Sequence, residues 1–278
     1  MTTLIDLIGR SRPADAAIAA PGRATLTHGE LRRLIEETRA ALNAQGIGRG
    51  YRLAMVLPNG PEAASTFIAC SAACATAPLN PGYRAEEFEF YLSDLKAKAL
   101  LLAEGIDTPA RAVAERLGIR LVTLQSEPGA AAGRFRPQFA GTPAGATPKG
   151  GPAESGDMAL MLHTSGTTSR PKLVGLTQAN LAASARHIGA AIALSPSDRC
   201  LNIMPLFHIH GLIGAVSSSL AAGSSIFATP ISADISVIEE PVVSKGAVRK
   251  KVPTPNRRKT PISIVRQARV RPTASESI

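Results

Sequence analysis

The chain has 278 residues, of which 45% are hydrophobic and 4% aromatic, with 31 Lys or Arg against 21 Asp or Glu. This length suits one large globular domain or two small ones, and the composition is the one expected of an Ala-rich soluble protein. The three cysteines, Cys70, Cys74 and Cys200, cannot all pair and form no Cys-x-x-Cys motif. We therefore predict buried thiols at these positions rather than a metal site.

The N-terminus lacks the basic start and apolar core of a signal peptide, so the cytoplasm is the expected compartment. A long uncharged stretch between Arg199 and Asp234 invites a membrane interpretation. However, it contains Pro205, two histidines and many Ser and Gly residues, whereas a spanning helix needs about 20 predominantly apolar residues. We expect a buried helix followed by a buried strand, and no membrane partner.

Positive charge is concentrated at the C-terminus. Residues 241–278 contain ten Lys or Arg and one acid, and so carry nine of the ten net positive charges. From residue 231 onward there is no Leu, Phe, Tyr or Trp. Because such a segment has little apolar area to bury, we expect residues 231–278 to form a disordered basic tail that follows a domain of residues 1–230.

Helical and strand patterns alternate along that domain. The predicted helices cover about residues 26–45, 61–75, 85–96, 108–117 and 178–194, and the predicted strands 52–57, 77–80, 99–102, 119–124 and 157–162. A hairpin ending at residues 175–177 is also expected. This alternation predicts an α/β fold of layered, mostly parallel sheets with flanking helices. Residues 129–156 are rich in Gly, Ala and Pro and are expected to be a flexible surface loop.

Residues 163–172, His-Thr-Ser-Gly-Thr-Thr-Ser-Arg-Pro-Lys, directly follow a predicted strand. Open α/β sheets place their ligands at this end of their strands. A glycine lets the main chain approach a polyanion closely, hydroxyl and N–H groups donate to phosphate oxygens, and Lys172 adds a compact positive charge. The segment is not a Walker A loop. It predicts a phosphate-binding loop, and an ordinary Ser/Thr-rich turn is the alternative.

The segment resembles the TSGTT-x-x-PK phosphate loop of the adenylate-forming (AMP-binding) superfamily, which includes the acyl-CoA synthetases. Residues 204–212, MPLFHIHGL, resemble the PLFH-x-x-G motif of that superfamily, in the same order along the chain. Ser169 stands where the family usually has glycine, and TTSRPK together with FHIHGL is most similar to the oxalate–CoA ligases. The segments LTHGEL, AMVLPNGPE and APLNPGYRAEEFEFYLSD also resemble the large N-terminal domain of acyl-CoA synthetases, so the resemblance covers residues 1–230.

The resemblance implies a reaction in two steps that uses ATP, Mg²⁺ and CoA. A small carboxylic acid attacks the α-phosphate of ATP to give an acyl-adenylate and pyrophosphate, and CoA then displaces AMP. The residues implied to bind the ATP phosphates are Thr164, Ser165, Gly166, Thr167, Thr168 and Lys172.

The same resemblance implies that His208 is catalytic, beside the acyl and α-phosphate groups, and that His208 and His210 line the acyl pocket. Two imidazoles would suit a small dicarboxylate such as oxalate better than a fatty acid. A buried structural role is the alternative for His210. A zinc site is not expected, because no further ligand cluster accompanies the two histidines.

Other family segments are absent from the sequence. They are the YG-x-[ST]E segment with its Mg²⁺-binding acid, the TGD ribose-binding segment, the R-x-x-K hinge, and the small C-terminal domain with its lysine. We therefore expect a truncated N-terminal domain, whose tail is either translated in a shifted reading frame or an evolved basic segment.

The favoured function is an AMP-forming acid–thiol ligase, with the activity of this chain by itself in doubt. One alternative is a non-catalytic fragment that at most binds nucleotide. The other is a nucleic-acid binder that uses the tail, although the tail lacks the aromatic residues on which bases stack. Neither motifs nor composition indicate an oligomeric state.

Overall fold

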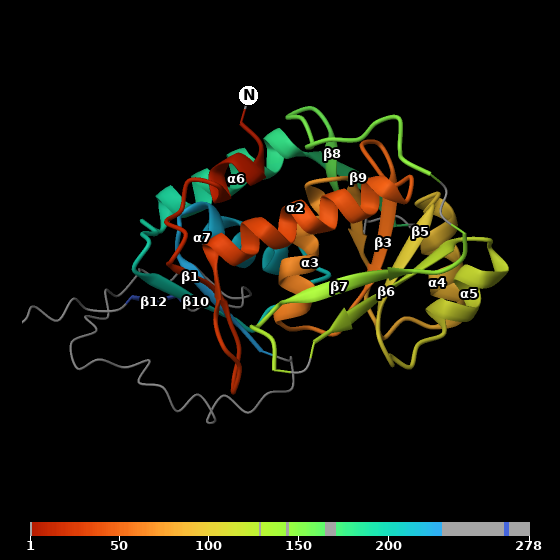
Figure 1. Cartoon of the computed structure of the whole chain (residues 1–278), viewed down its shortest axis with the longest axis horizontal. Coiled ribbons are helices and arrows are strands. Elements are labelled where there is room, and N and C mark those ends of the chain that lie inside the picture. The colour runs from red at the N-terminus through yellow and green to blue at the C-terminus, as the bar shows by residue number, and fades with distance from the viewer. Residues whose placement is uncertain (1, 128, 143–144, 165–170, 230–263, 267–278) are drawn as a thin grey trace, which may run out of the picture.

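The computed structural model describes residues 2–127, 129–142, 145–164, 171–229 and 264–266, which form two β-sheets with helices between and beside them (Figure 1). The larger sheet has seven strands. Their order across the sheet is β7 (Phe135–Phe139), β6 (Arg120–Ser126), β5 (Ala99–Ala103), β3 (Arg52–Val56), β4 (Ala75–Pro78), β8 (Met158–Thr164) and β9 (Lys172–Thr177). Strands β6, β5, β3, β4 and β8 run parallel, and the edge strands β7 and β9 are antiparallel to their neighbours.

The smaller sheet brings together segments from both ends of the described chain. Its order is β12 (Ile264–Arg266), β10 (Asp198–Asn202), β11 (Ser225–Ala228), β1 (Ala16–Ala19) and β2 (Leu26–Thr27). Strands β1 and β11 run parallel, with Ile18 opposite Ile226. The N-terminal strand is therefore built into the interior of this sheet.

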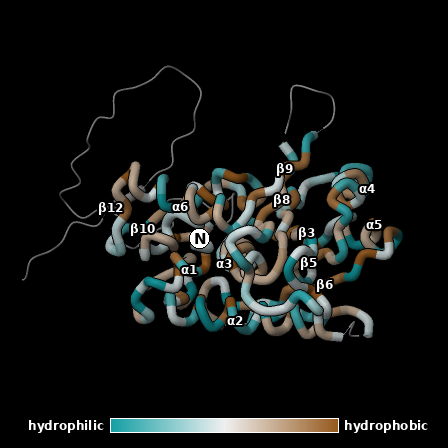
Figure 2. Tube along the Cα trace, turned by 90° about the horizontal axis from the view of Figure 1, so that it is seen from above, coloured by the Kyte–Doolittle hydropathy of each residue, from teal (hydrophilic) through white to brown (hydrophobic). Residues whose placement is uncertain are grey.

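The helices form layers on the two sheets. They are α1 (Leu4–Ile8), α2 (His28–Ala44), α3 (Pro61–Ser71), α4 (Ala85–Asp94), α5 (Ala110–Arg116), α6 (Gln178–Ala191), the π-helix η1 (His210–Ser217) and α7 (Ser218–Ala221). Helix α3 contacts β4 of the larger sheet and β1 and β11 of the smaller one. Both views place α3 between the two sheets, with α4 and α5 on the opposite face of the larger sheet (Figures 1 and 2).

The central strands are apolar on both faces because each face has a helical cover. In β3 and β5, Leu53, Met55 and Leu101 belong to the core shared with α2 and α3. The alternating residues Val56 and Leu102 pack in the second core with α4 and α5. Burial on both faces explains why these strands have continuous apolar sequences, as is typical of parallel sheets.

Local sequence signals account for the starts of the main helices. Thr27 caps α2 and Thr177 caps α6, each accepting a hydrogen bond from the main chain three residues on. Helix α3 instead begins with Pro61 directly after Gly60. Proline suits the first helical position, since its fixed φ matches the helix and its missing N–H would have no partner there.

Most predicted elements are confirmed, with boundaries shifted by a few residues. The predicted flexible loop at 129–156 is wrong in part, because it contains β7, paired antiparallel with β6. Strands β1, β2 and β10 were not predicted. The expected buried helix and strand after Arg199 correspond to η1 with α7 and to β11. Over the described part of the chain, every helix is too short or too polar to cross a bilayer.

The cysteine prediction is confirmed, since Cys70, Cys74 and Cys200 are free and buried. Burial raises the pKa of the Cys74 thiol to about 12. Of the predicted disordered tail, residues 264–266 form β12 beside β10, which corrects the prediction for these three residues. Residues 231–263 and 267–278 lie outside the described residues.

Candidate functional site

The candidate site lies where parallel strands of the larger sheet end. Strands β3, β4 and β8 are neighbours and run parallel, so their carboxyl ends lie at the same edge of the sheet. The segment that follows β3 begins Leu57-Pro58-Asn59-Gly60, and the predicted phosphate loop follows β8. The fold thus places this loop at the edge where α/β proteins bind their ligands.

The predicted phosphate loop joins two strands of a hairpin. Thr164 ends β8 and Lys172 begins β9, and the two residues are direct partners in the antiparallel ladder. The hydroxyl of Thr164 also donates to the carbonyl oxygen of Lys172 at 3.4 Å. Lys172 is exposed. Ser165, Gly166, Thr167 and Thr168 lie outside the described residues, so the hairpin brings together the two ends of the predicted phosphate site.

His163 directly precedes the predicted phosphate loop, and its contacts with α4 were not predicted from the sequence. Its Nε2 lies 2.9 Å from Oδ2 of Asp94, at the end of α4, and its side chain is only 5% exposed. Its ring meets Tyr91 edge to face, with the centroids 4.7 Å apart. An ionised carboxylate only accepts hydrogen bonds, so Nε2 carries the hydrogen. The contact fixes the residue directly before the loop.

His208 and His210 lie on an exposed turn and at the start of η1. The main chain of this turn is ordered by two hydrogen bonds, from His208 N to Pro205 O at 3.2 Å and from Leu212 N to His208 O at 3.1 Å. The ring of His208 lies beside that of Phe207, with centroids 4.5 Å apart. His210 is not buried, which removes the alternative of a buried structural histidine, and its place in an acyl pocket stays a prediction.

Asn59 links this turn to the larger sheet and was also missed. Its side-chain oxygen accepts a hydrogen bond from Leu206 N at 2.9 Å, and its Nδ2 donates to Thr229 O at 2.9 Å. Leu206 lies two residues before His208. The turn that carries His208 is therefore attached to the same sheet edge as the phosphate loop.

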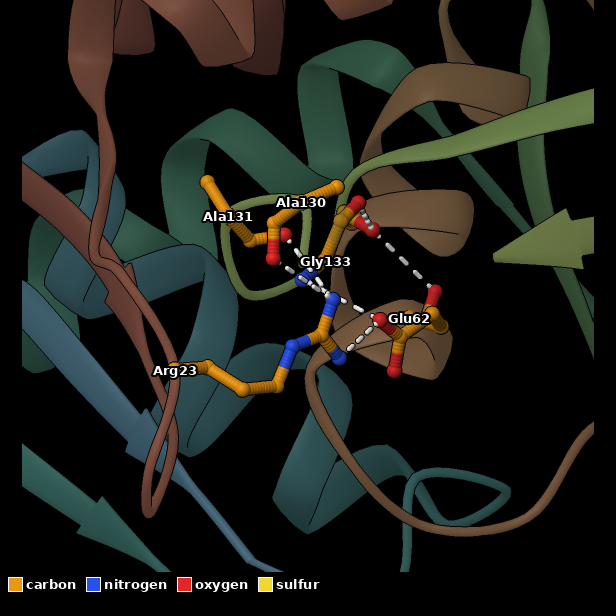
Figure 3. A network of polar contacts seen from close by, with 6 residues as sticks. Arg23, Glu62, Ala130, Ala131 and Gly133 are labelled. Atoms are coloured by element: carbon orange, nitrogen blue, oxygen red, sulfur yellow. Dashed lines mark hydrogen bonds and ion pairs between the residues drawn. The ribbon is translucent and has the colours of Figure 1, made fainter. Parts of the chain in front are cut away.

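A polar network fixes the start of α3 next to Asn59 (Figure 3). Arg23 pairs with Glu62 and donates to the carbonyl oxygen of Ala131 at 3.0 Å. Glu62 also accepts a hydrogen bond from Gly133 N at 3.3 Å, and the hydroxyl of Ser65 donates to Gly133 O at 2.6 Å. This network ties the segment before β7 to the first turn of α3.

A cavity of about 460 Å³ lies elsewhere, lined by Arg12, Asp15, Ser195, Asp198 and their neighbours. It lies at the amino ends of β1, β10 and β11 of the smaller sheet. Within the described residues, no group of three or more His, Cys, Asp or Glu side chains could hold a metal ion.

Comparisons with known proteins agree with the motifs. The sequence model of the AMP-binding enzyme family matches residues 8–243. A protein of Humulus lupulus named as a CoA ligase is 42% identical over 218 residues, which cover 76% of this chain and 40% of that protein. The oxalate–CoA ligase of Arabidopsis thaliana is 40% identical over 229 residues, covering 81% of this chain and 44% of that protein. The chain thus spans less than half the length of these relatives.

Solved structures share the fold. Apo MatB from Rhodopseudomonas palustris superposes with a TM-score of 0.68 at 24% identity, covering 82% of this chain and 45% of MatB. The ATP-bound form of the same protein gives a TM-score of 0.68 and covers 87% of this chain. The layered sheets are therefore the fold of the N-terminal domain of adenylate-forming enzymes.

Proposed function

This chain belongs to the AMP-binding enzyme family, and we propose that it acts as an ATP-dependent ligase that joins a small carboxylic acid to CoA. The observation that carries the proposal is the β8–β9 hairpin. It holds Thr164 and Lys172 opposite each other at the edge of the larger sheet where the parallel strands β3, β4 and β8 end. The cationic end of Lys172 and the hydroxyl of Thr164 suit the phosphates of ATP.

In the proposed reaction, a carboxylate oxygen of the acid attacks the α-phosphorus of ATP and pyrophosphate leaves. The thiol of CoA then loses its proton to solvent, its sulfur attacks the acyl carbon, and AMP leaves with the bonding electrons. Two anions must meet in the first step, so the protein contributes mainly by orientation and by neutralising charge. We assign Lys172 and the loop residues 164–168 to the ATP phosphates, and we assign His208 a hydrogen bond to the attacking carboxylate.

Oxalate is the acid that we propose. Relatives named as oxalate–CoA ligases are 40% identical in Arabidopsis thaliana and 35% identical in Saccharomyces cerevisiae. Other relatives are named for sulfoacetate and indoleacetate, at 29% and 30% identity, so the family accepts chemically different acids. Two exposed histidines two positions apart, His208 and His210, suit a compact dianion that needs a hydrogen-bond donor at each end.

Binding of Mg-ATP to the purified chain, measured by calorimetry, tests the nucleotide part of the proposal. The variant Lys172→Met is expected to weaken binding about tenfold or more, since one charge-assisted hydrogen bond contributes about 1.5–3 kcal/mol. Lys149→Met is the matched control, because Lys149 is also exposed but lies in a segment before β8. Wild-type protein that binds no Mg-ATP, or equal affinities for the two variants, would contradict the assignment.

A second candidate is a chain that binds nucleotide without catalysing ligation. Oxalate-dependent exchange of pyrophosphate into ATP separates the two candidates. Binding without exchange supports the second candidate, and exchange that depends on oxalate supports the ligase.

A nucleic-acid-binding role for residues 241–278 is a weaker proposal, which their ten basic residues motivate. Retention on DNA at low salt should disappear when these residues are deleted. Retention that survives the deletion would contradict this role.

A further inference from the structure

Asn59 joins three segments that are far apart in the sequence. It follows β3 of the larger sheet, whereas its partner Thr229 directly follows β11 of the smaller sheet. Its other partner, Leu206, belongs to the turn between β10 and η1. One side chain therefore connects the carboxyl ends of strands from both sheets and the turn that carries His208.

The chemistry of this junction requires an amide. Both partners are main-chain groups outside the helices and strands, one an N–H and the other a carbonyl. A side-chain amide offers an acceptor and donors on the same planar group, whereas a carboxylate only accepts and an aliphatic side chain does neither. Asn59 thus satisfies two main-chain groups that ladders and helices leave without partners.

The position of Asn59 is itself fixed by its neighbours. Gly60 has φ of 152° and ψ of −173°, a conformation that is practically restricted to glycine, and Pro61 starts α3. Glu62 is held by Arg23 and by Gly133 N (Figure 3). Asn59 consequently extends from an anchored helix start rather than from a free loop.

The turn beyond Leu206 transmits this position to His208. The carbonyl oxygen of Pro205 accepts a hydrogen bond from His208 N at 3.2 Å. A side chain on Gly211 would place its Cβ 2.6 Å from that same oxygen, so the turn packs tightly against the start of η1. A shift of Leu206 would therefore move His208 as well.

We infer that Asn59 is a positioning residue, which holds the main chain of the His208 turn in a fixed position relative to the end of β11. Its consequence for catalysis rests on the proposed function, whereas the coupling between the two sheets does not. The role follows from two hydrogen bonds of 2.9 Å, which join Asn59 to residues 147 and 170 positions away in the sequence.

Exchange of main-chain amide hydrogens in the full chain, followed by mass spectrometry, tests the coupling. In Asn59→Ala, peptides covering residues 203–212 and 225–229 are expected to exchange about tenfold faster, because local opening becomes easier where contacts are lost. Peptides from α2 should keep their wild-type rates. Unchanged rates in a folded variant, or an equal increase along the whole chain, would overturn the inference.

Two further variants sharpen this test. Asn59→Asp keeps an acceptor for Leu206 N but faces the Thr229 carbonyl with another acceptor, so only residues 225–229 should exchange faster. Asn80→Ala is the matched control, since Asn80 follows neighbouring β4 and accepts a local hydrogen bond from Gly82 N at 2.9 Å. Both monitored segments should keep their wild-type rates in this control. If Asn59→Asp accelerates hydrogen exchange in both segments as much as Asn59→Ala does, the assignment of two separate hydrogen bonds is contradicted.

Pyrophosphate exchange kinetics distinguish positioning from general stability. Asn59→Ala is expected to lower kcat about tenfold while KM for ATP changes less than about twofold, as for an interaction that matters in the transition state. Asn59→Asp, with one bond retained, should lie between wild type and Asn59→Ala. If the wild-type protein catalyses exchange and Asn59→Ala is equally active, the inference is contradicted. An inactive wild type counts against the proposed function, and hydrogen exchange then decides the role of Asn59.

Discussion

The imidazole of His163 and the carboxylate of Asp94 lie 2.9 Å apart and tie the end of α4 to the strand that leads into the predicted phosphate loop. The imidazole is almost fully enclosed, whereas the carboxylate is 44% exposed. Tyr91 covers the imidazole from the preceding part of α4. The direction in which the chain leaves β8 is therefore set by a residue 69 positions earlier.

Removing the carboxylate of Asp94 should destabilise the fold. Asp94→Ala leaves a buried ring nitrogen without its acceptor, and the free energy of unfolding is expected to fall by about 1–3 kcal/mol. Asp94→Asn retains an acceptor and removes a negative charge from a helix C-terminus, so it should be close to wild type. Urea denaturation measures the free energy of unfolding of both variants. Glu115→Ala, at an exposed position of α5, is the control, and a loss in Asp94→Ala no larger than this control would contradict the prediction.

The backbone at Gly60 should not tolerate a side chain. Gly60→Ala forces alanine into φ of 152° and is expected to cost about 1–3 kcal/mol of unfolding free energy. Gly156→Ala is the control, because Gly156 has a negative or extended φ and no atom lies within 4 Å of its added Cβ. Thermal denaturation of the two variants compares them. Equal midpoints would show that the chain can relax at Gly60 without loss.

Substitution of Gly211 tests the close packing of the His208 turn. In Gly211→Ala the added Cβ meets the Pro205 carbonyl oxygen at 2.6 Å, and a clash with backbone should cost about 1–3 kcal/mol. Gly189→Ala, in the last turn of α6, has its nearest contact at 4.0 Å and should gain up to about 1 kcal/mol from helix propensity. Opposite signs of the two changes in urea midpoint are expected. A stable Gly211→Ala protein would contradict the packing argument.

Acid should weaken the fold through His28, which starts α2 and is fully buried. Burial lowers its pKa from 6.5, and the main chain of Ser224 partly opposes this effect. The unfolded state then binds more protons than the folded state below about pH 6.5, so this contribution to stability is complete above that pH and is lost as pH falls towards the folded-state pKa.

Unfolding midpoints between pH 7 and pH 5 measure this effect. In His28→Gln the decline of stability over this range should be smaller than in wild type, because the variant carries no titrating group at this position. His187→Gln, at an exposed position of α6, should keep the wild-type decline. Parallel pH profiles for wild type and His28→Gln would rule out His28 as the source.

The central strands were predictable because their sequences are short, apolar and buried on both faces. Strand β7 was not, since it contains Pro137 and exposed polar residues at Arg136 and Gln138. Its place explains the sequence, because β7 is an edge strand, where a missing N–H and polar side chains are tolerated.

The candidate site was proposed from two contiguous motifs, at residues 163–172 and 204–212, and the roles of their residues stay predictions. The supporting contacts were not predictable from the sequence. Asn59 meets its partners across 147 and 170 residues, and His163 meets Asp94 across 69. Such pairings depend on how strands are ordered in the sheets, and local periodicity contains no information on that order.

The pairing of β1 with β11 has a consequence for biosynthesis. Ile18 leaves the ribosome early, but its parallel neighbour Ile226 is translated about two hundred residues later. At a synthesis rate of about 5–20 residues per second, the nascent strand waits roughly 10–40 s for this neighbour. During that time its apolar residues are available to chaperones, and the smaller sheet can close only after nearly all of the described chain has been made.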